Sequence, residues 1–257
     1  MEQKPSVSLV LPVYNEEPNI AHALELCLAS LDRHSKDSEV IVVDDASTDR
    51  STEIVTAFSE RDGRVRLIRH RENLKLGRSL RTGFEAASKD LVLYMDADLP
   101  VDPEVLGSAI RAMNVTRADV IAGYRFDRTT EGFKRSVYSW GYNQLISVLF
   151  GWPYRDINFA FKLLRREVLE AVELKSEGSL IDAELIVKAK NLGFAVQQVG
   201  LDYFPRIRGR STLSSPAVIF TILRELAALY PDMRRPTRKR ELPHVVSGIE
   251  KREPAGS

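Results

Sequence analysis

The sequence has too few cysteines and histidines for the metal sites that those residues usually build. Among 257 residues there is one cysteine, Cys27, and there are four scattered histidines without the short spacing of a ligand pair. One cysteine cannot form an internal disulfide, and it cannot supply a zinc site built on several cysteines. If the chain binds a metal, other side chains must hold it.

Strong net charge and long apolar runs are also absent. The formal net charge is +1, so the chain lacks the overall basic field of nucleic-acid-binding proteins, and we expect no nucleic-acid partner. No apolar run reaches about 18 residues, the length of a membrane span. The first residues, MEQKPSVSLVLPVYNEE, lack the layout of a signal peptide. These features predict a cytoplasmic protein without a transmembrane segment.

The first half of the chain alternates short apolar runs with amphipathic segments. The expected strands are Val7–Val13, Glu39–Val43, Val65–Arg69 and Leu91–Met95, and the expected helices are Asn19–Leu31, Ser51–Arg61 and Arg78–Ala87. Strands that alternate with helices pair in parallel and are covered by helices on both faces. The pattern predicts an α/β fold with a Rossmann-like, mostly parallel sheet.

The second half is less regular and ends in a charged segment that contains prolines. Strands are expected at Asp119–Gly123 and Ala195–Val199, and helices at Lys134–Phe150, Asp182–Leu192 and Pro216–Tyr230. From residue 231 onward the composition is typical of a disordered tail. We therefore expect one domain over residues 1–230 and a disordered tail over residues 231–257.

Acidic side chains follow three of the expected strands at the point where each strand ends. Glu16 follows the first strand, Asp44 and Asp45 follow the second, and Asp96 and Asp98 follow the fourth. In open α/β sheets, ligands bind beyond the carboxyl ends of the strands. These carboxylates are therefore expected to converge on one crevice.

The Asp96-Ala97-Asp98 sequence is a candidate metal site. Carboxylate oxygens suit Mg²⁺ or Mn²⁺, and such an ion would also bind the oxygens of a diphosphate. There it would neutralise the charge that develops on a departing nucleoside diphosphate. A lone D-x-D can equally be an exposed acidic turn, but the two neighbouring acidic strand ends favour the metal site.

Several motifs in order resemble those of the family 2 glycosyltransferases. They are Leu11–Glu16 (LPVYNE), Val43–Asp49 (VDDASTD), Asn73–Gly83 (NLKLGRSLRTG) and Asp96–Leu99 (DADL). The similarity runs from about Val7 to Ser211. It implies the GT-A type of α/β fold, a metal-binding D-x-D and, usually, transfer with inversion.

The resemblance also implies which residues bind the nucleotide-sugar donor. Pro12, Tyr14 and Glu16 would line the nucleoside, Val43 and Asp45 would contact the base and ribose, and Ala97 would lie against the donor within the D-x-D. A strand-end carboxylate can accept a hydrogen bond from a ribose hydroxyl, which suits this role for Asp45.

Several residues of these motifs have a plain structural alternative. Asp44 or Asp45 could cap the helix that follows, although Ser47 or Asp49 is the better candidate for that cap. Tyr14 could belong to the core. The pair Gly77 and Gly83 could serve close helix packing as easily as ligand approach.

Within the family, the chain looks most like the dolichyl- or polyprenyl-phosphate mannosyltransferase branch. The matching segments are Gly123–Arg125, Asp156–Leu163 and Arg206–Ser211. By this resemblance Arg125 and Arg206 bind donor phosphate, and Arg135 binds the phosphate of a lipid acceptor. Guanidinium groups fit phosphate oxygens bidentately, although a solvated basic face is the ordinary alternative. That alternative is preferred for Arg208 and Arg210.

The acceptor decides whether a catalytic base is needed. A lipid monophosphate is already anionic, whereas a hydroxyl acceptor needs a carboxylate to remove its proton. Asp156 and Glu184 are the candidates for that base, and a cap or a salt bridge is the alternative for each. Two departures from the branch affect this region: Thr212 stands where the branch has lysine, and Phe159-Ala160 replaces a smaller pair.

The segment Val137–Trp152 is rich in aromatic and apolar residues and has Lys134, Arg135 and Arg155 on its flanks. This pattern suits a lipid–water interface and equally suits a buried helix. With the motifs, it leads to the hypothesis of an inverting transfer of one sugar from a GDP-sugar, such as GDP-mannose, or a UDP-sugar to a polyprenyl or dolichyl monophosphate. The enzyme would make peripheral contact with the inner face of the membrane. A glycosyltransferase with a hydroxyl acceptor, or a non-catalytic nucleotide-sugar binding module, are the alternatives.

Overall fold

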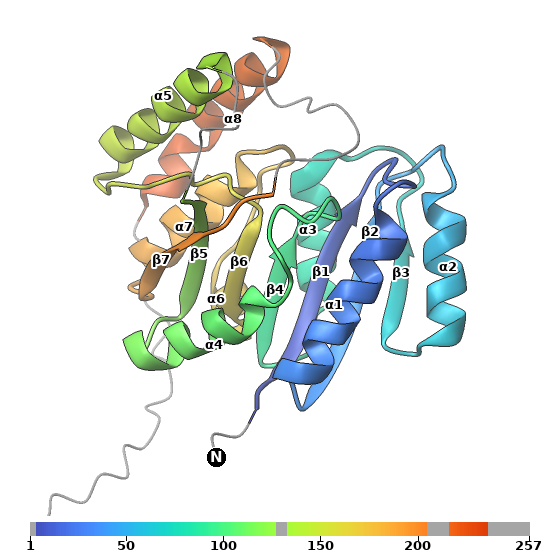
Figure 1. Cartoon of the computed structure of the whole chain (residues 1–257). Coiled ribbons are helices and arrows are strands. Elements are labelled where there is room, and N and C mark those ends of the chain that lie inside the picture. The colour runs from blue at the N-terminus through green and yellow to red at the C-terminus, as the bar shows by residue number, and fades with distance from the viewer. Residues whose placement is uncertain (1–3, 127–132, 205–215, 236–257) are drawn as a thin grey trace, which may run out of the picture.

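A computed structural model describes residues 4–126, 133–204 and 216–235; for residues 133–138 and 216–219 it describes the backbone alone. Its centre is a seven-stranded sheet in the order β3-β2-β1-β4-β6-β5-β7 (Figure 1). The strands are β1 Ser6–Val13, β2 Asp37–Asp44, β3 Val65–Arg69, β4 Leu91–Met95, β5 Val120–Arg125, β6 Phe161–Arg165 and β7 Val196–Leu201. The helices are α1 Ile20–His34, α2 Ser51–Arg61, α3 Lys75–Ala86, α4 Val105–Thr116, α5 Phe133–Phe150, α6 Arg166–Ala171, α7 Ile181–Asn191 and α8 Pro216–Arg234.

Strand β1 is the centre of the parallel part of the sheet. It pairs in parallel with β2 on one side and with β4 on the other, and β2 pairs in parallel with β3. Its side chains alternate between two cores: Leu9 packs on one face of the sheet and Val10 on the other. A strand covered on both faces needs an unbroken apolar run, which explains why this segment was predictable.

The helices form a layer on each face of the sheet (Figure 1). Helices α1, α2 and α4 cover the face of Leu9, while α3, α6 and α7 cover the face of Val10. Helices α5 and α8 lie side by side near the carboxyl end of the sheet, and the rings of Phe150 and Tyr230 join them at 5.6 Å between centroids. The predicted α/β architecture with helices on both faces is confirmed.

Strand β6 is the main feature that the sequence did not predict. It lies between β4 and β5 and runs antiparallel to both. The run Phe161–Arg165 has a lysine, Lys162, among its apolar residues, and this charge hid the strand. Helices α4 and α6 were also unexpected.

The predicted boundary of the tail at residue 231 is too early. Helix α8 continues through Pro231 to Arg234, and Met233 is fully buried. Asp232 accepts hydrogen bonds from Lys175 at 2.9 Å and Lys188 at 2.6 Å, which fixes this last turn to the rest of the protein. The rest of the predicted tail, residues 236–257, lies outside the described residues.

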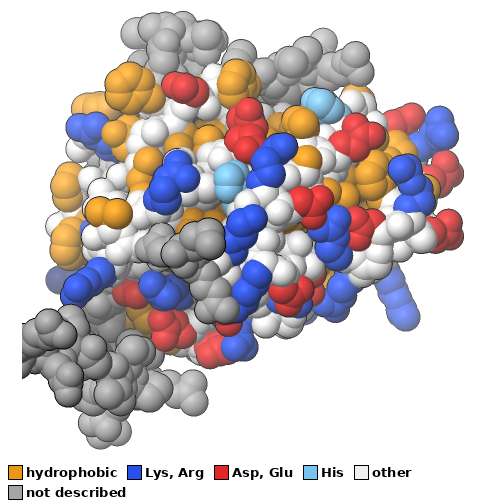
Figure 2. Space-filling model, turned by 60° about the horizontal axis from the view of Figure 1, so that its bottom comes forward, with side chains coloured by type: hydrophobic (Ala, Val, Ile, Leu, Met, Phe, Trp, Pro, Cys, Tyr) orange, Lys and Arg blue, Asp and Glu red, His pale blue; other side chains and the backbone are white. Residues whose placement is uncertain are grey.

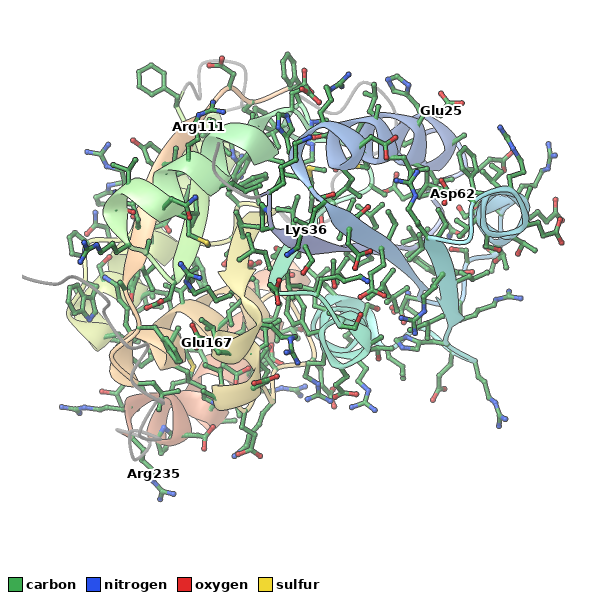
Figure 3. The ribbon with its side chains drawn as sticks, turned by 90° about the horizontal axis from the view of Figure 1, so that it is seen from below. Glu25, Lys36, Asp62, Arg111, Glu167 and Arg235 are labelled. Carbon is green, nitrogen blue, oxygen red and sulfur yellow. The ribbon has the colours of Figure 1, made fainter. Side chains whose placement is uncertain are left out.

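The amino-terminal edge of the sheet is an ordinary solvated surface. Acidic and basic side chains are interspersed over the face drawn in Figure 2. Seen from this edge in Figure 3, Glu25, Asp62 and Arg111 lie around the rim of the molecule. Among the described residues, no helix combines the length and apolar character needed to cross a membrane.

Candidate functional site

The loops after β1 and β2 are joined at the carboxyl edge of the sheet. The backbone N–H of Asn15 donates to Ser47 Oγ at 3.0 Å, and Asn15 Oδ1 accepts from the N–H of Thr48 at 2.8 Å. The N–H of Glu16 donates to Ser51 Oγ at 2.9 Å. The loops that follow the first two strands are therefore joined, while the convergence of their carboxylates on one crevice stays a prediction.

The D-x-D loop borders the same region. A pocket of about 460 Å³ lies between it and the start of α1, and Pro18, Asn19, Ala97 and Asp98 are among the residues that line it. Phe204, just beyond β7, also lines the pocket, and its N–H donates to the carbonyl of Pro100 at 3.0 Å. Segments that follow β1, β4 and β7 thus surround this pocket, and the end of β2 is not among its lining residues.

Backbone strain is concentrated at this edge. Six non-glycine residues in the described part of the chain have a positive φ, and five of them lie in the loops at the carboxyl edge. These five are Asn15 (55°), Ala46 (62°), Lys75 (71°), Leu99 (52°) and Asp156 (49°). Such strained residues persist where the surrounding structure holds them, and they cluster at binding and catalytic sites.

The D-x-D residues form a tight turn after β4. The N–H of Leu99 donates to the carbonyl of Asp96 at 3.2 Å, and Ala97 is buried in the core. Asp96 and Asp98 are half-buried, and Ala97 and Asp98 line the pocket. Contact of Ala97 with a donor stays a prediction.

The chemistry of these carboxylates fits Mg²⁺ or Mn²⁺. Within the described residues, no group of three or more His, Cys, Asp or Glu side chains gathers as a complete metal cage. A magnesium-like ion in a nucleotide site does not need one, because it takes one or two carboxylates and completes its shell with waters and phosphate oxygens. Asp96 and Asp98 are sufficient for such a site.

Asp45 is buried and held by three hydrogen bonds. Its Oδ1 accepts from His70 Nδ1 at 2.7 Å and from the N–H of Leu74 at 2.9 Å, and its Oδ2 accepts from the N–H of Lys75 at 2.8 Å. The last two contacts satisfy backbone donors at the start of α3. Asp45 is thus a helix cap, though for α3 rather than for α2.

The neighbouring acids stabilise the loop after β2. Asp44 accepts from the N–H of Ser47 at 2.8 Å and from the hydroxyl of Thr52. Asp49 accepts from the N–H of Ser51, the first residue of α2, at 3.0 Å. Of the two residues expected to cap α2, Asp49 is therefore the one that contacts it.

The other predicted donor residues differ in exposure. Tyr14 is 48% exposed, so the core alternative for Tyr14 is wrong. Val43 is fully buried, its backbone included. Pro12 is half-buried, and Glu16 accepts from Asn19 Nδ2 at 2.7 Å. Their contacts with a nucleoside stay predictions.

Arg125 and Asp156 form a buried ion pair. Arg125 Nε lies 2.8 Å from Asp156 Oδ2, and the two side chains are 9% and 2% exposed. The guanidinium also stacks over the rings of Phe159 and Tyr203, at 5.4 and 5.0 Å from the centroids. The salt-bridge alternative for Asp156 is therefore realised, and this pair anchors the turn before β6.

Glu184 has a structural role. It is fully buried and accepts hydrogen bonds from Lys188 Nζ and from the N–H of Ser176, both at 2.7 Å. The N–H of Lys175 donates to it at 2.9 Å. Since two backbone donors and a cation surround it, Glu184 is a poor candidate for the catalytic base.

A buried charge cluster behind the site was not predicted. Lys162 Nζ lies 2.5 Å from Asp182 Oδ1, and both side chains are at most 2% exposed. The hydroxyl of Tyr94, two residues before the D-x-D, donates to Asp182 at 2.8 Å. Burial raises the pKa of Asp182, and the Lys162 cation opposes this rise. The isolated lysine in an apolar run was the available sequence signal.

The phosphate-binding residues expected from the resemblance are mostly outside the described side chains. Arg206 lies outside the described residues, as do Arg208 and Arg210. Arg135 belongs to α5, where only its backbone is described. The phosphate contacts of Arg125, Arg135 and Arg206 stay predictions.

Helix α5 has one buried face and one exposed apolar face. Asn143 and Ile146 are buried, whereas Trp140 and Val148 are 64% and 81% exposed. The expectation of a buried helix is confirmed for one face, while contact of the other face with a lipid–water interface stays a prediction. On the adjoining α8, Phe220 is 69% exposed.

The family is established by comparison with known proteins. The model of the family "Glycosyl transferase family 2" matches residues 8–173, which include the ends of β1 and β2 and the D-x-D. The chain belongs to the family 2 glycosyltransferases. As a member of this family it resembles, among other proteins, glycosyltransferase AglD of Haloferax volcanii, with 31% identity over 207 residues.

Two further relatives have names that state an acceptor. The dodecaprenyl-phosphate galacturonate synthase of Rhizobium johnstonii is 28% identical over 68% of this chain. The undecaprenyl-phosphate 4-deoxy-4-formamido-L-arabinose transferase of Edwardsiella ictaluri is 33% identical over 65% of this chain. The matched regions are 33% of AglD, 52% of the synthase and 51% of the transferase, so this chain spans a third to about half of these relatives.

Solved structures show the same fold. Glucosyl-3-phosphoglycerate synthase from Mycobacterium tuberculosis, in complex with Mn²⁺, UDP-glucose and phosphoglyceric acid, superposes with a TM-score of 0.69 at 20% identity, over 88% of this chain and 80% of that one. The mannosyltransferase PcManGT from Pyrobaculum calidifontis, in complex with GDP-mannose and Mn²⁺, gives 0.60 at 20% identity, over 90% and 72%. The expected GT-A fold is confirmed.

Proposed function

We propose that this family 2 glycosyltransferase transfers one sugar from a nucleotide sugar to a polyprenyl-type lipid monophosphate, with inversion at the sugar carbon. The pocket that Asp98 lines, between the D-x-D turn and the loop after β1, is the observation that carries the proposal, and hydrogen bonds join that loop to the loop after β2. The names of the galacturonate synthase and the arabinose transferase support a polyprenyl phosphate acceptor. The structures of relatives with UDP-glucose or GDP-mannose support a nucleotide-sugar donor.

Asp96 and Asp98 would hold Mg²⁺ or Mn²⁺ in this reaction. When bound, the ion neutralises the negative charge that grows on the nucleoside diphosphate as it leaves. Mn²⁺ accompanies the donor in both structural relatives, which supports a divalent ion here. Tyr14 and Asp45 would contact the nucleoside, and Arg125 would approach the donor phosphate.

The burial and ion pairing of three acids, Asp156, Asp182 and Glu184, favour an anionic acceptor. Asp156 is paired with Arg125, Asp182 with Lys162, and Glu184 with Lys188. Each of these three carboxylates is buried against its cation, so none of them is exposed to a hydroxyl acceptor. A phosphate monoester needs no such base: its oxygen attacks the sugar carbon as the bond to the nucleoside diphosphate breaks.

The exposed apolar face of α5 and α8 supports contact with a lipid surface. Trp140, Val148 and Phe220 are each more than half exposed, and α5 and α8 lie side by side (Figure 1). Apolar and aromatic side chains of this kind enter the boundary between headgroups and acyl chains. We propose peripheral contact with a membrane through this face, from its cytoplasmic side.

The test is a transfer assay with separated products. The purified chain is incubated with Mn²⁺ and labelled GDP-mannose, UDP-glucose or UDP-galacturonic acid, with undecaprenyl or dolichyl monophosphate in detergent. Label should pass to the organic phase as a lipid-linked sugar. Transfer only to water-soluble hydroxyl acceptors would contradict the lipid acceptor, and metal-dependent binding without turnover would favour a binding module.

A further inference from the structure

His70 contacts the carboxylate of Asp45, which is expected to bind the donor nucleoside. Its Nδ1 lies 2.7 Å from Asp45 Oδ1, and its Nε2 lies 3.0 Å from Thr82 Oγ1. The side chains of His70 and Asp45 are 10% and 6% exposed. The N–H of His70 donates to the carbonyl of Asp44 at 2.9 Å, which extends the pairing of β2 and β3. His70 is thus held by its backbone N–H, and its imidazole ring is held at both nitrogens.

These contacts indicate which ring nitrogen of His70 donates a hydrogen bond and which accepts one. Asp45 is an acceptor when ionised, so Nδ1 must carry a proton and donate it to Oδ1. In the neutral imidazole Nε2 then accepts from the hydroxyl of Thr82, which lies on the second turn of α3. His70 therefore ties the end of β2 to α3 through two side chains.

The other hydrogen bonds of Asp45 show how many of its acceptor positions are already used. An ionised carboxylate offers about four acceptor positions, and Asp45 uses three of them for His70, Leu74 and Lys75. One position on Oδ2 is left for a ribose hydroxyl or a base N–H. Oδ2 also holds the N–H of Lys75, whose φ of 71° is costly for a residue with a side chain.

We propose that His70, supported by Thr82, is a positioning residue for the donor nucleoside. It holds the Asp45 carboxylate in the orientation that caps α3, keeps Lys75 in its strained conformation and leaves one acceptor position on Oδ2 for the donor. This inference rests on the proposed function, in which Asp45 contacts the nucleoside. Binding of the donor costs less free energy when the Asp45 carboxylate is already oriented. His70 is therefore expected to raise the affinity for the nucleotide.

Nucleotide affinity separates a positioning role from a purely structural one. The dissociation constants of UDP and GDP with Mn²⁺ are measured by calorimetry for the wild type, His70→Ala, Asp45→Asn and the double variant. Loss of a hydrogen bond to a charged group corresponds to about tenfold or more in affinity, so His70→Ala should bind the preferred nucleotide about tenfold more weakly. In the Asp45→Asn background the same change should cost less than about threefold, because its effect passes through Asp45.

A conservative variant and a distant control complete the test. In His70→Asn the amide nitrogen can take the place of Nδ1 and donate to Asp45, so this variant should recover most of the affinity. Thr82→Val, which removes only the hydroxyl, should weaken binding by a few-fold and serves if His70→Ala does not fold. His34→Ala, at the far end of α1 beside Glu104, should bind as the wild type does.

The outcomes distinguish this inference from the proposed function. Under saturating donor, His70→Ala should keep its kcat while its donor KM rises. Wild-type affinity in a folded His70→Ala, full additivity with Asp45→Asn, or no recovery in His70→Asn would each overturn the positioning role. If the wild type binds a nucleotide but transfers no sugar to lipid phosphate, the proposed function fails while the affinities still decide the role of His70.

Discussion

Gly77 and Glu177 approach so closely that no side chain fits between their backbones. The N–H of Gly77 donates to the carbonyl of Glu177 at 2.8 Å, and a Cβ on Gly77 would lie 2.5 Å from the carbonyl oxygen of Ser176. The N–H of Glu177 in turn donates to Glu225 Oε1 on α8 at 2.6 Å. The start of α3, which Asp45 caps, is thereby packed through one loop against α8.

Replacing Gly77 by alanine should destabilise the protein, because the new methyl group meets backbone atoms that cannot rotate away. We expect a loss of about 1–3 kcal/mol in the free energy of unfolding, measured by urea denaturation. Gly63→Ala is the matched control, since a Cβ there meets nothing within 4 Å. Equal stability of the two variants would show that the loop containing Ser176 and Glu177 can move to accommodate a methyl group on Gly77.

Asp98→Ala should abolish metal-dependent sugar transfer and leave the fold intact. Loss of a carboxylate that binds the ion removes the charge neutralisation of the leaving group, so kcat should fall by about two orders of magnitude or more. Calorimetry should also show that Mn²⁺ no longer strengthens nucleotide binding. Asp102→Ala is the control, because Asp102 lines the same pocket outside the D-x-D. Near-normal turnover in Asp98→Ala would contradict the role of Asp98 as a metal ligand.

Most of the fold could be predicted because its strands are continuous apolar runs. Such a run identifies a strand but does not show which strands lie beside it or in which direction it runs. The antiparallel position of β6 between β4 and β5 therefore could not be predicted from the sequence. Lys162 further disguised that strand, since its partner Asp182 is 20 residues away in the sequence and nothing local marks the pair.

The candidate site was predictable where a strand ends in acid residues, as at Asp45 and Asp98. Their surroundings were not, because the partner of Asp45 is His70, 25 residues further along the chain, and it meets Asp45 only after β3 has paired. Glu184 was assigned by residue type alone. Its saturation by Ser176 and Lys188 depends on a loop conformation that the sequence does not encode visibly.

Lys162→Met should destabilise the protein because it leaves the buried Asp182 without its cation. Removal of one partner of a buried pair costs about 3–5 kcal/mol. Adding Asp182→Asn should recover much of this loss, since the amide is neutral and its oxygen can still accept from Tyr94. Thermal unfolding of the single and double variants measures both effects. A double variant no more stable than Lys162→Met would contradict the explanation.

The deficit of Lys162→Met should also depend on pH. Burial raises the pKa of Asp182 in the folded state above its unfolded value, and removal of Lys162 raises it further. Between the two pKa values the folded state holds a proton that the unfolded state has lost, so the free energy of unfolding falls as pH rises. The variant should therefore be closest to the wild type near pH 4 and furthest from it above the folded pKa. A deficit independent of pH would exclude Asp182 as its source.

The apolar face of α5 and α8 should govern access to the lipid acceptor without affecting the donor. In Trp140→Glu and Phe220→Glu, each carboxylate would have to enter the lipid boundary, so binding to vesicles of phosphatidylethanolamine and phosphatidylglycerol should weaken by about tenfold or more per change. Flotation measures the vesicle-bound fraction, and calorimetry should give unchanged nucleotide affinity. Val115→Glu is the control, since Val115 is 84% exposed on α4, on the other side of the molecule. If all three variants lose vesicle binding equally, added negative charge explains the loss; if none does, this face does not meet the membrane.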